Sequence, residues 1–212
     1  MHPNPAYRRQ SQAGALDFAR ERGFGALIVA SSGAGPDEVL AAHLPFVLEG
    51  EVLAAHLVRS NPLARLLRDG PTAALMMVTG PDGYISPDWY GEPDRVPTWN
   101  YLAVHLRGEL RLIDEAGLRA HLDRLAANFE ARLAPKAPWK TDKMTPDVLA
   151  RLLRQIVPVE MIVETVESTF KLNQNGADSA RLGAAAGLAA GGTPGLETQA
   201  LAALMREVEG RE

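Results

Sequence analysis

The stretch YLAVHLRGELRLI, residues 101–113, alternates apolar and polar side chains along its whole length. One face collects the apolar side chains of Leu102, Val104, Leu106, Leu110 and Leu112. A period of two residues is typical of a strand that buries one face, and sheets with one solvated face are usually antiparallel. This segment therefore predicts a half-buried antiparallel strand.

Segments on both sides of this strand extend the same pattern. Asp114 is placed to cap a helix whose leucines recur at helical spacing, and a second capped helix begins at 145–147, so a helical pair is expected over 114–157. The turn-forming sequence SSGAGPDE occupies 31–38. Further strands are expected at 25–30, 39–44, 52–57, 72–79 and 159–167, and short helices at 12–22 and 61–69. Strands, then a helical pair, then a returning strand indicate an α+β protein with a small barrel or strongly coiled sheet.

The sequence VLAAHL occurs twice, at 39–44 and 52–57, and predicts a hairpin. With Glu49-Gly50 as a two-residue turn, Leu48 would face Glu51, and His43 would lie opposite His56. Pro45 lies within the first of these strands and is placed to distort the register.

Composition excludes several classes of protein. The 212 residues are 46% hydrophobic and 23% charged, which is ordinary for a globular domain. With no cysteine, disulfides and thiolate metal sites are impossible, and a cytoplasmic location is expected. No apolar run is long enough to span a membrane, and no signal peptide is expected from MHPNPAYRRQ. The net charge of −4 argues against direct DNA binding.

Three histidines on expected strands, His43, His56 and His105, allow three interpretations. Opposed imidazoles with a third nearby could bind a metal, but no carboxylate or cysteine completes a ligand set, so no metal is expected. They could instead face a ligand, or serve only as hydrogen-bonding groups of the sheet.

Two polar motifs also allow a functional and an ordinary interpretation. Arg59, Ser60 and Asn61 precede Pro62, so free helix amides beside a guanidinium would suit a phosphate, although Asn-Pro is also a common helix cap. The motif KLNQN at 171–175 offers paired amide donors and acceptors for the edge of a flavin ring, or forms a polar turn.

The segment YISPDWYGEPDRVPTWNY at 84–101 is unusually rich in aromatic rings and prolines. Such rings suit a partner surface or a planar ligand, and they could equally plug the core of their own subunit. We expect Trp89, Tyr90 and Trp99 to lose exposure only when a second subunit covers them.

Together with HLPF (43–46), HLVRSNP (56–62), VPTWNYLAVH (96–105) and KLNQN, this segment resembles the PaiB family of FMN-binding negative transcriptional regulators. The resemblance spans about residues 43–175. It implies an antiparallel split β-barrel, like that of pyridoxamine-phosphate oxidase, with flanking helices. It also implies a homodimer with FMN at the subunit interface. The alternative is a flavin- or haem-dependent oxidoreductase with only an indirect effect on transcription.

The resemblance, together with the motifs above, implies a set of flavin-binding residues, whereas no catalytic residue is assigned. The set comprises His43, His56, Arg59, Ser60, Asn61, Tyr84, Ser86, Trp89, Tyr90, Thr98, Trp99, Asn100, His105, Lys171, Gln174 and Asn175. The family usually carries Gly-Lys where this chain has Ser168-Thr169, and Arg where it has Gly176. The loss of two cations predicts weaker flavin binding than is usual in the family.

The expected layout is a single split-barrel domain over 1–182. A mobile linker rich in glycine and alanine would follow at 183–195, and a last helix would occupy 196–212.

Overall fold

A computed structural model describes residues 1–30 and 39–208, so the turn expected at 31–38 lies outside the described residues. Its strands are β1 (Phe24–Ala30), β2 (Val39–Glu49), β3 (Val52–Val58), β4 (Thr72–Ile85), β5 (Thr98–Leu112) and β6 (Ile156–Lys171). Its α-helices are α1 (Gln12–Arg22), α2 (Pro62–Leu66), α3 (Leu118–Glu130), α4 (Pro146–Leu153), α5 (Asp178–Ala189) and α6 (Thr198–Glu207). Single turns of 3-10 helix are η1 (Pro5–Tyr7), η3 (Pro87–Tyr90), η4 (Glu115–Gly117), η5 (Ala131–Leu133) and η6 (Thr141–Lys143).

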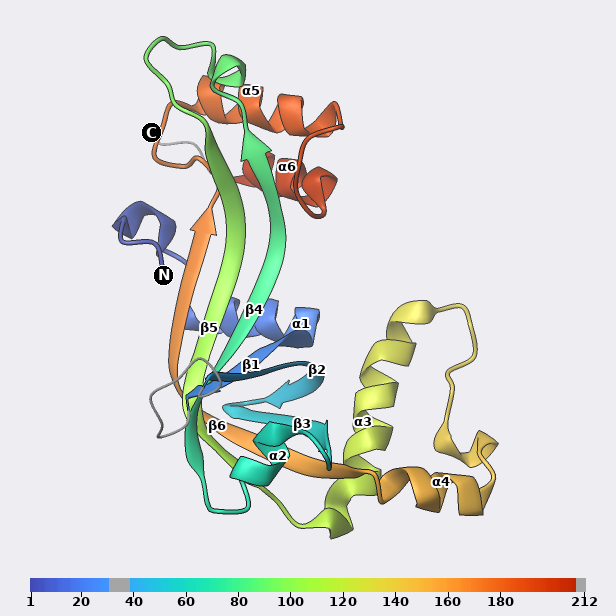
Figure 1. Cartoon of the computed structure of the whole chain (residues 1–212). Coiled ribbons are helices and arrows are strands. Elements are labelled where there is room, and N and C mark those ends of the chain that lie inside the picture. The colour runs from blue at the N-terminus through green and yellow to red at the C-terminus, as the bar shows by residue number, and fades with distance from the viewer. Residues whose placement is uncertain (31–38, 209–212) are drawn as a thin grey trace. The chain divides into compact units, whose positions relative to one another are not determined.

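The strands close into a barrel in the order β1-β2-β3-β6-β5-β4 (Figure 1). The pairs β1–β2, β2–β3, β3–β6 and β1–β4 are antiparallel. The alternation along β5 is confirmed, because Leu102, Val104, Leu106 and Leu110 are all buried. The α+β split barrel predicted from the sequence is therefore the fold of this chain.

The hairpin of β2 and β3 exists, but its predicted register is wrong by two positions. Glu49 pairs with Val52 and Phe46 with Ala55, so the turn lies at Gly50 and Glu51. Gly50 has φ of 59°, a left-handed conformation that glycine adopts without strain. The shift places this glycine first in the turn.

The described residues form two compact units. One unit comprises 19–77 and 106–166 and holds most of the barrel, with fully buried Phe46, Leu48 and Met161 in its core. The other comprises 1–18, 78–105 and 167–212. Its core joins Ile85, Tyr90, Leu102, Leu172, Leu188, Leu201 and Met205.

Helix α5 occupies part of the segment that was expected to be a mobile linker. Residues 183–189 belong to this helix, which buries Ala180, Ala184, Ala185 and Leu188. Glycine and alanine lower the bulk of the helix, so it approaches its neighbours closely, and this contact outweighs the low helix propensity of glycine. Figure 1 shows α5 and α6 side by side.

Helices α3 and α4 form the expected helical pair within the barrel-containing unit. The Asp114 side chain accepts a hydrogen bond of 2.8 Å from the Ala116 amide and so caps the single turn that precedes α3. Leu118 and Leu125 of α3 are buried. Across the described ranges, no helix has the length and apolar character needed to cross a bilayer.

Candidate functional site

Lys171, at the end of β6, is a half-buried cation held beside the start of β5. Its ammonium donates a hydrogen bond to the Thr98 hydroxyl and lies 5.9 Å from the centre of the Tyr7 ring. Burial lowers the pKa of Lys171. Within residues 1–30 and 39–208 it forms no ion pair with a carboxylate, so its charge is available to an anion.

The rest of the KLNQN motif forms a turn. The Gln174 carbonyl oxygen accepts from the Leu172 amide at 2.7 Å, and its amide nitrogen donates to the carbonyls of Ala6 and Phe170. Asn173 has a positive φ of 64°, which asparagine tolerates better than most residues. Gln174 therefore closes the turn, while Asn175 is exposed.

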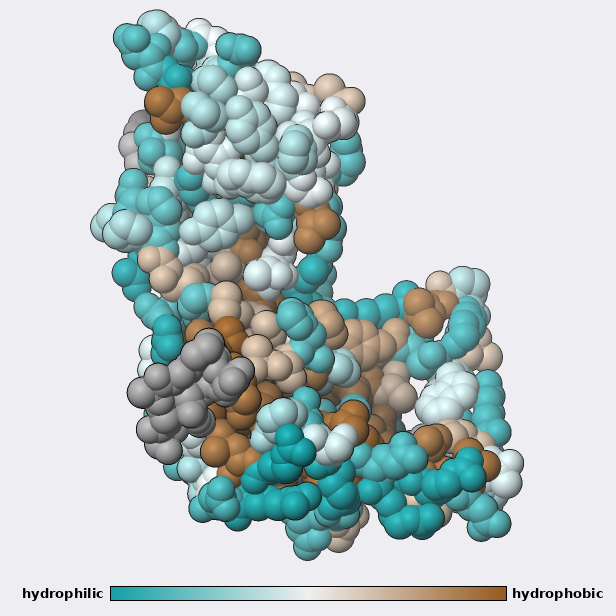
Figure 2. All heavy atoms as spheres, in the orientation of Figure 1, coloured by the Kyte–Doolittle hydropathy of each residue, from teal (hydrophilic) through white to brown (hydrophobic). Residues whose placement is uncertain are grey.

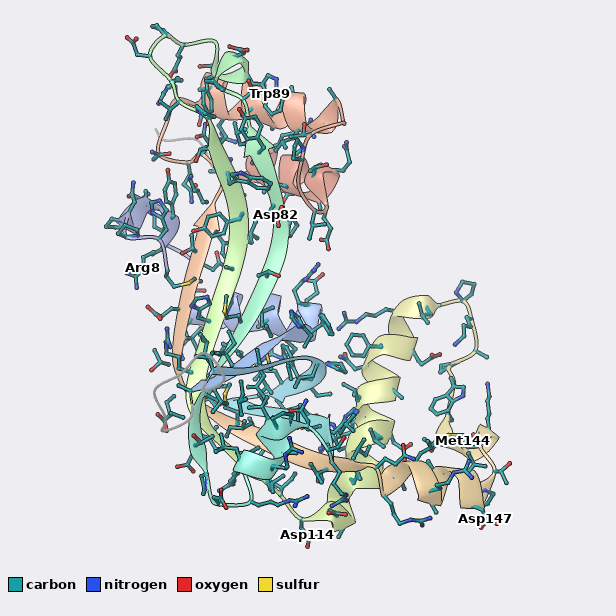
Figure 3. All side chains as sticks on the ribbon, in the orientation of Figure 1. Arg8, Asp82, Trp89, Asp114, Met144 and Asp147 are labelled. Atoms are coloured by element: carbon teal, nitrogen blue, oxygen red, sulfur yellow. The ribbon has the colours of Figure 1, made fainter. Side chains whose placement is uncertain are left out.

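The aromatic segment packs onto its own subunit in part. Ser86 caps the 3-10 turn η3, and Tyr90 at its end is only 7% exposed. The Trp89 ring lies directly against Gly187 of α5, where a Cβ atom would overlap it (Figure 3). Trp99 stays 45% exposed. We expected Trp89, Tyr90 and Trp99 to become buried only when a second subunit covers them. This expectation is wrong for Tyr90, because helix α5 of the same chain packs against it.

The remaining expected residues of this unit have mixed environments. Asn100 is fully buried: its amide nitrogen lies 3.5 Å from the Met205 sulfur, and its carbonyl oxygen has no hydrogen-bond partner among the described residues. Tyr84 and His105 are half-buried on β4 and β5. Asn100 thus belongs to the core of this unit.

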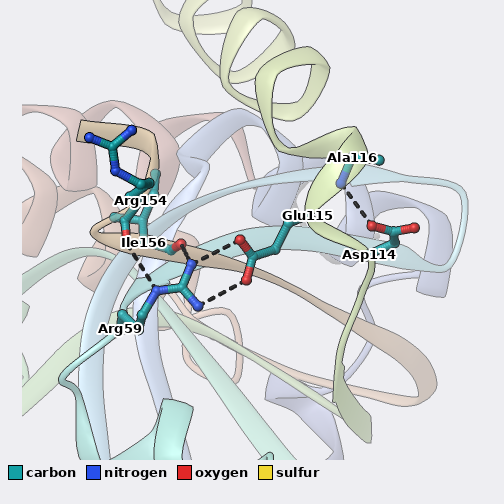
Figure 4. A network of polar contacts seen from close by, with 6 residues as sticks. All are labelled: Arg59, Asp114, Glu115, Ala116, Arg154 and Ile156. Carbon is teal, nitrogen blue, oxygen red and sulfur yellow. Dashed lines mark hydrogen bonds and ion pairs between the residues drawn. The ribbon is translucent and has the colours of Figure 1, made fainter. Parts of the chain in front are cut away.

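In the barrel-containing unit, Arg59 follows β3 and is held by its own chain (Figure 4). Two of its nitrogens donate to the two Glu115 carboxylate oxygens at 2.9 Å. Further donors reach the carbonyls of Arg154 at 2.9 Å and Ile156 at 3.0 Å. The hydrogen bonds from Arg59 lower the pKa of the Glu115 carboxyl. This guanidinium joins three segments and has little capacity left for a phosphate.

The Asn-Pro motif next to Arg59 is an ordinary helix cap. The Asn61 side chain accepts from the Leu63 amide at 2.9 Å, and Pro62 takes the first position of α2. Ser60 is exposed.

The expected pairing of His43 with His56 is wrong, because the hairpin register differs. His43 is exposed on β2, lies opposite Ala26 of β1 and stacks against Phe24 at 6.3 Å between ring centres. His56 lies opposite Pro158 of β6. Within the described ranges, no group of three or more histidines and carboxylates is arranged to hold a metal ion.

His56 has a different partner, His121 of α3, which is not among the site residues expected from the sequence. The His56 Nδ1 lies 3.4 Å from the His121 Nε2, and His121 is only 3% exposed. Burial, then the neighbouring charges of His56 and Arg124, lower the pKa of His121 to about 4. Burial also lowers the pKa of His56. His121 lies three residues after Leu118 and four before Leu125, so it shares their face of α3. This helical spacing in the sequence indicates that His121 is buried.

Comparison with solved structures shows which proteins share this fold. The FAD and heme binding protein from Mycobacterium smegmatis aligns with 18% identity over 90% of this chain and 83% of its own, with a TM-score of 0.55. The flavocytochrome Anf3 from Azotobacter vinelandii aligns with 17% identity over 81% of this chain and 72% of its own, with a TM-score of 0.53. The chain therefore shares the split-barrel fold of these two proteins.

Sequence comparison narrows this class to a family. The profile of a family described as "Putative FMN-binding domain" matches residues 1–165. The protease synthase and sporulation protein PAI 2 of Bacillus subtilis (strain 168) is 30% identical over 176 residues, which cover 81% of each chain. The chain therefore belongs to the FMN-binding PaiB family that its motifs indicated.

Proposed function

We propose that the protein binds FMN as a homodimer, with the flavin at the subunit interface and the FMN phosphate at Lys171. The observation that carries this proposal is a half-buried lysine that has a hydroxyl partner, Thr98, and no carboxylate partner among the described residues. Partial burial of a cation without a counter-ion has a free-energy cost, and a phosphate dianion would offset that cost.

Two side chains of the expected flavin set that belong to the same compact unit as Lys171 support this proposal by remaining accessible. These are Trp99 and Asn175, which are both exposed. Trp99 offers a planar apolar surface with a polar edge, which suits a subunit interface or a flat ring. When bound, the flavin supplies hydride and one-electron transfer. The chain binds and orients it, with Lys171 and Thr98 holding the phosphate.

Titration of FMN and riboflavin, followed by flavin fluorescence, tests the proposal. Lys171→Gln should weaken FMN binding by about tenfold or more, the usual loss for one charged hydrogen bond, and leave riboflavin binding unchanged. Lys140→Gln removes an exposed lysine and serves as the matched control. Absence of FMN binding by the unaltered protein would refute the flavin proposal. If Lys171→Gln weakened the binding of FMN and riboflavin equally, the result would contradict the assignment of the FMN phosphate to Lys171.

For transcription, we propose an indirect role in a cytoplasmic protein. The net charge is −4, and the chain has no cysteine. An acidic chain is poorly suited to neutralise DNA phosphates. The alternative is a flavin- or haem-dependent oxidoreductase with only an indirect effect on transcription. A mobility-shift assay at modest salt should show no sequence-specific DNA complex, and a tight one would contradict the indirect role.

A further inference from the structure

A cavity of about 460 Å³ lies between α3 and α4 in the barrel-containing unit. Helix α3 forms one wall, and α4 forms another. The loop between them closes a third side with Trp139 and Met144, and Pro45 of β2 and Ile156 of β6 complete the lining. Figure 2 shows hydrophobic residues gathered beside α3 and over α4, and Figure 3 marks Met144 beside α4.

The apolar faces of both helices point to space that the subunit does not fill. Helix α4 has eight residues and none is buried, although Leu149, Leu152 and Leu153 all line the cavity. Leu152 is 43% exposed. A helix this short is marginal in water without packing of its apolar face. An occupant of the cavity would supply that packing.

The loop between α3 and α4 is held against α3 by hydrogen bonds and an ion pair, so this wall of the cavity exists before a ligand binds. The Trp139 amide donates to the Glu130 carboxylate at 2.7 Å, and Lys136 pairs with the same carboxylate. The Thr141 hydroxyl donates to Asp123 at 2.7 Å. A pocket whose walls are already held loses less entropy when a ligand binds.

The lining carries no charged side chain, and its polar side chains are Thr141 and Gln155. The Thr141 hydroxyl is already engaged by Asp123 and Arg119. A charged ligand would lose its hydration here without gaining a counter-ion. The phosphate of FMN is excluded for the same reason, so this cavity is distinct from the flavin site proposed at Lys171.

We propose that this cavity binds a neutral, predominantly apolar small molecule with an aromatic ring. Its volume falls in the range of roughly 300–1,000 Å³ that is usual for small-ligand pockets. Trp139 and Phe129 supply aromatic surfaces, and Met144 supplies an adaptable one. Gln155 is exposed in the lining, and within the part of the chain that the structure describes its side-chain amide forms no hydrogen bond, so it can orient a single polar group on the ligand.

The test is a fluorescence titration of the full chain with N-phenyl-1-naphthylamine, a neutral aromatic probe that brightens in apolar surroundings. Saturable binding of one probe per chain is expected. Ala126→Phe fills the cavity and should weaken binding by about tenfold or more. Ala120→Phe makes the same change at an exposed position of α3 outside the lining, and should leave binding unchanged.

A second variant guards against misfolding of the first. Leu152→Glu puts a charge at an exposed lining position and should also weaken probe binding, with an unchanged circular dichroism spectrum. Probe binding that is unsaturable, or equal in both cavity variants and the unaltered protein, would overturn the proposal. Loss of a dimer in light scattering of Leu152→Glu would show that a second copy fills the cavity and would also overturn it. FMN titration of the same variants should be unaffected, which separates this result from the flavin proposal.

Discussion

His121 of α3 and His56 of β3 face each other with 3.4 Å between the Nε2 of the first and the Nδ1 of the second. At this distance the two imidazoles are compatible while both are neutral, and one of them can then donate its proton toward the other. A positive charge on His121 would be buried and would be repelled by a charged His56 and by Arg124, the two neighbouring groups that lower its pKa. Arg124 itself lies 3.8 Å from Glu49 of β2.

Acid should destabilise the protein through His121. Its pKa is 6.5 in an unfolded chain and about 4 in the folded state, so the unfolded state binds the proton first as pH falls. The contribution of His121 to stability is therefore constant above pH 6.5 and is lost progressively as the pH falls from 6.5 to 4. The full loss is about 3 kcal/mol. Urea unfolding at a series of pH values measures it.

The matched variants for this prediction are His121→Leu and His43→Gln. His121→Leu should flatten the pH dependence between 6.5 and 4, while His43→Gln, at an exposed position, should retain it. An identical pH dependence in His121→Leu and the unaltered protein would contradict the assignment to His121.

Removal of Arg59 should destabilise the protein more than removal of Glu115. Arg59→Ala loses the ion pair and also leaves the carbonyls of Arg154 and Ile156 without this donor, whereas Glu115→Ala loses the ion pair alone. Both side chains are partly exposed, so the ion pair itself contributes little. The thermal midpoints of the two variants, measured at low and high salt, check this order. Equal midpoints would mean that the two carbonyl contacts are unimportant.

Gly187 should be intolerant of a methyl group only while Trp89 is present. Gly187→Ala places a Cβ atom in the Trp89 ring and should cost about 1–3 kcal/mol through overpacking. In a Trp89→Ala background the same change should stabilise α5 by up to about 1 kcal/mol, since alanine is the better helix former. Denaturant unfolding of the four proteins in this double-mutant cycle measures the coupling. Additive effects would show that the ring and the glycine do not touch in solution.

Trp99 should report subunit association. Trp99 is 45% exposed, so a second subunit could cover it. Trp89, in contrast, already packs on α5 of its own subunit. In a Trp89→Phe, Trp139→Phe background, acrylamide quenching of Trp99 should fall as protein concentration rises and a dimer forms. Light scattering fixes the oligomeric state at each concentration. Quenching that stays constant while a dimer forms would place Trp99 outside the interface.

Periodicity was a good guide to those elements of the fold that bury one face in a simple way. The strand at 101–113 and the helix at 12–22 correspond to β5 (Thr98–Leu112) and α1 (Gln12–Arg22). The register of the β2–β3 hairpin was harder to predict from the sequence. Gly50 can be either the first or the second residue of a two-residue turn, and tertiary packing selects between these positions. The helix at 178–189 was missed for a similar reason, since a surface of glycine and alanine stabilises a helix only when another element packs on it.

The site was harder to predict because hydrogen-bond partners are set by tertiary structure. Arg59 looked free to bind phosphate, but Glu115 is 56 residues away in sequence and became visible as its partner only in the fold. The side-chain amide of Gln174 likewise already donates hydrogen bonds to the carbonyls of Ala6 and Phe170. Lys171 is the member of the expected set whose charge stays available, and no local pattern distinguished it from Arg59.

The close contact between Trp89 and α5 bears on where this protein can be cut. The match to the family profile ends at residue 165, yet α5 begins at Asp178 and packs against Tyr90 and Trp89. A fragment ending at 165 would also break β6, which continues to Lys171. Such a fragment would carry bare aromatic and aliphatic side chains into solvent and would be prone to aggregate. The end of the profile match at residue 165 is therefore not the end of an independently folding unit. A fragment made for expression should keep the whole of β6 and helix α5.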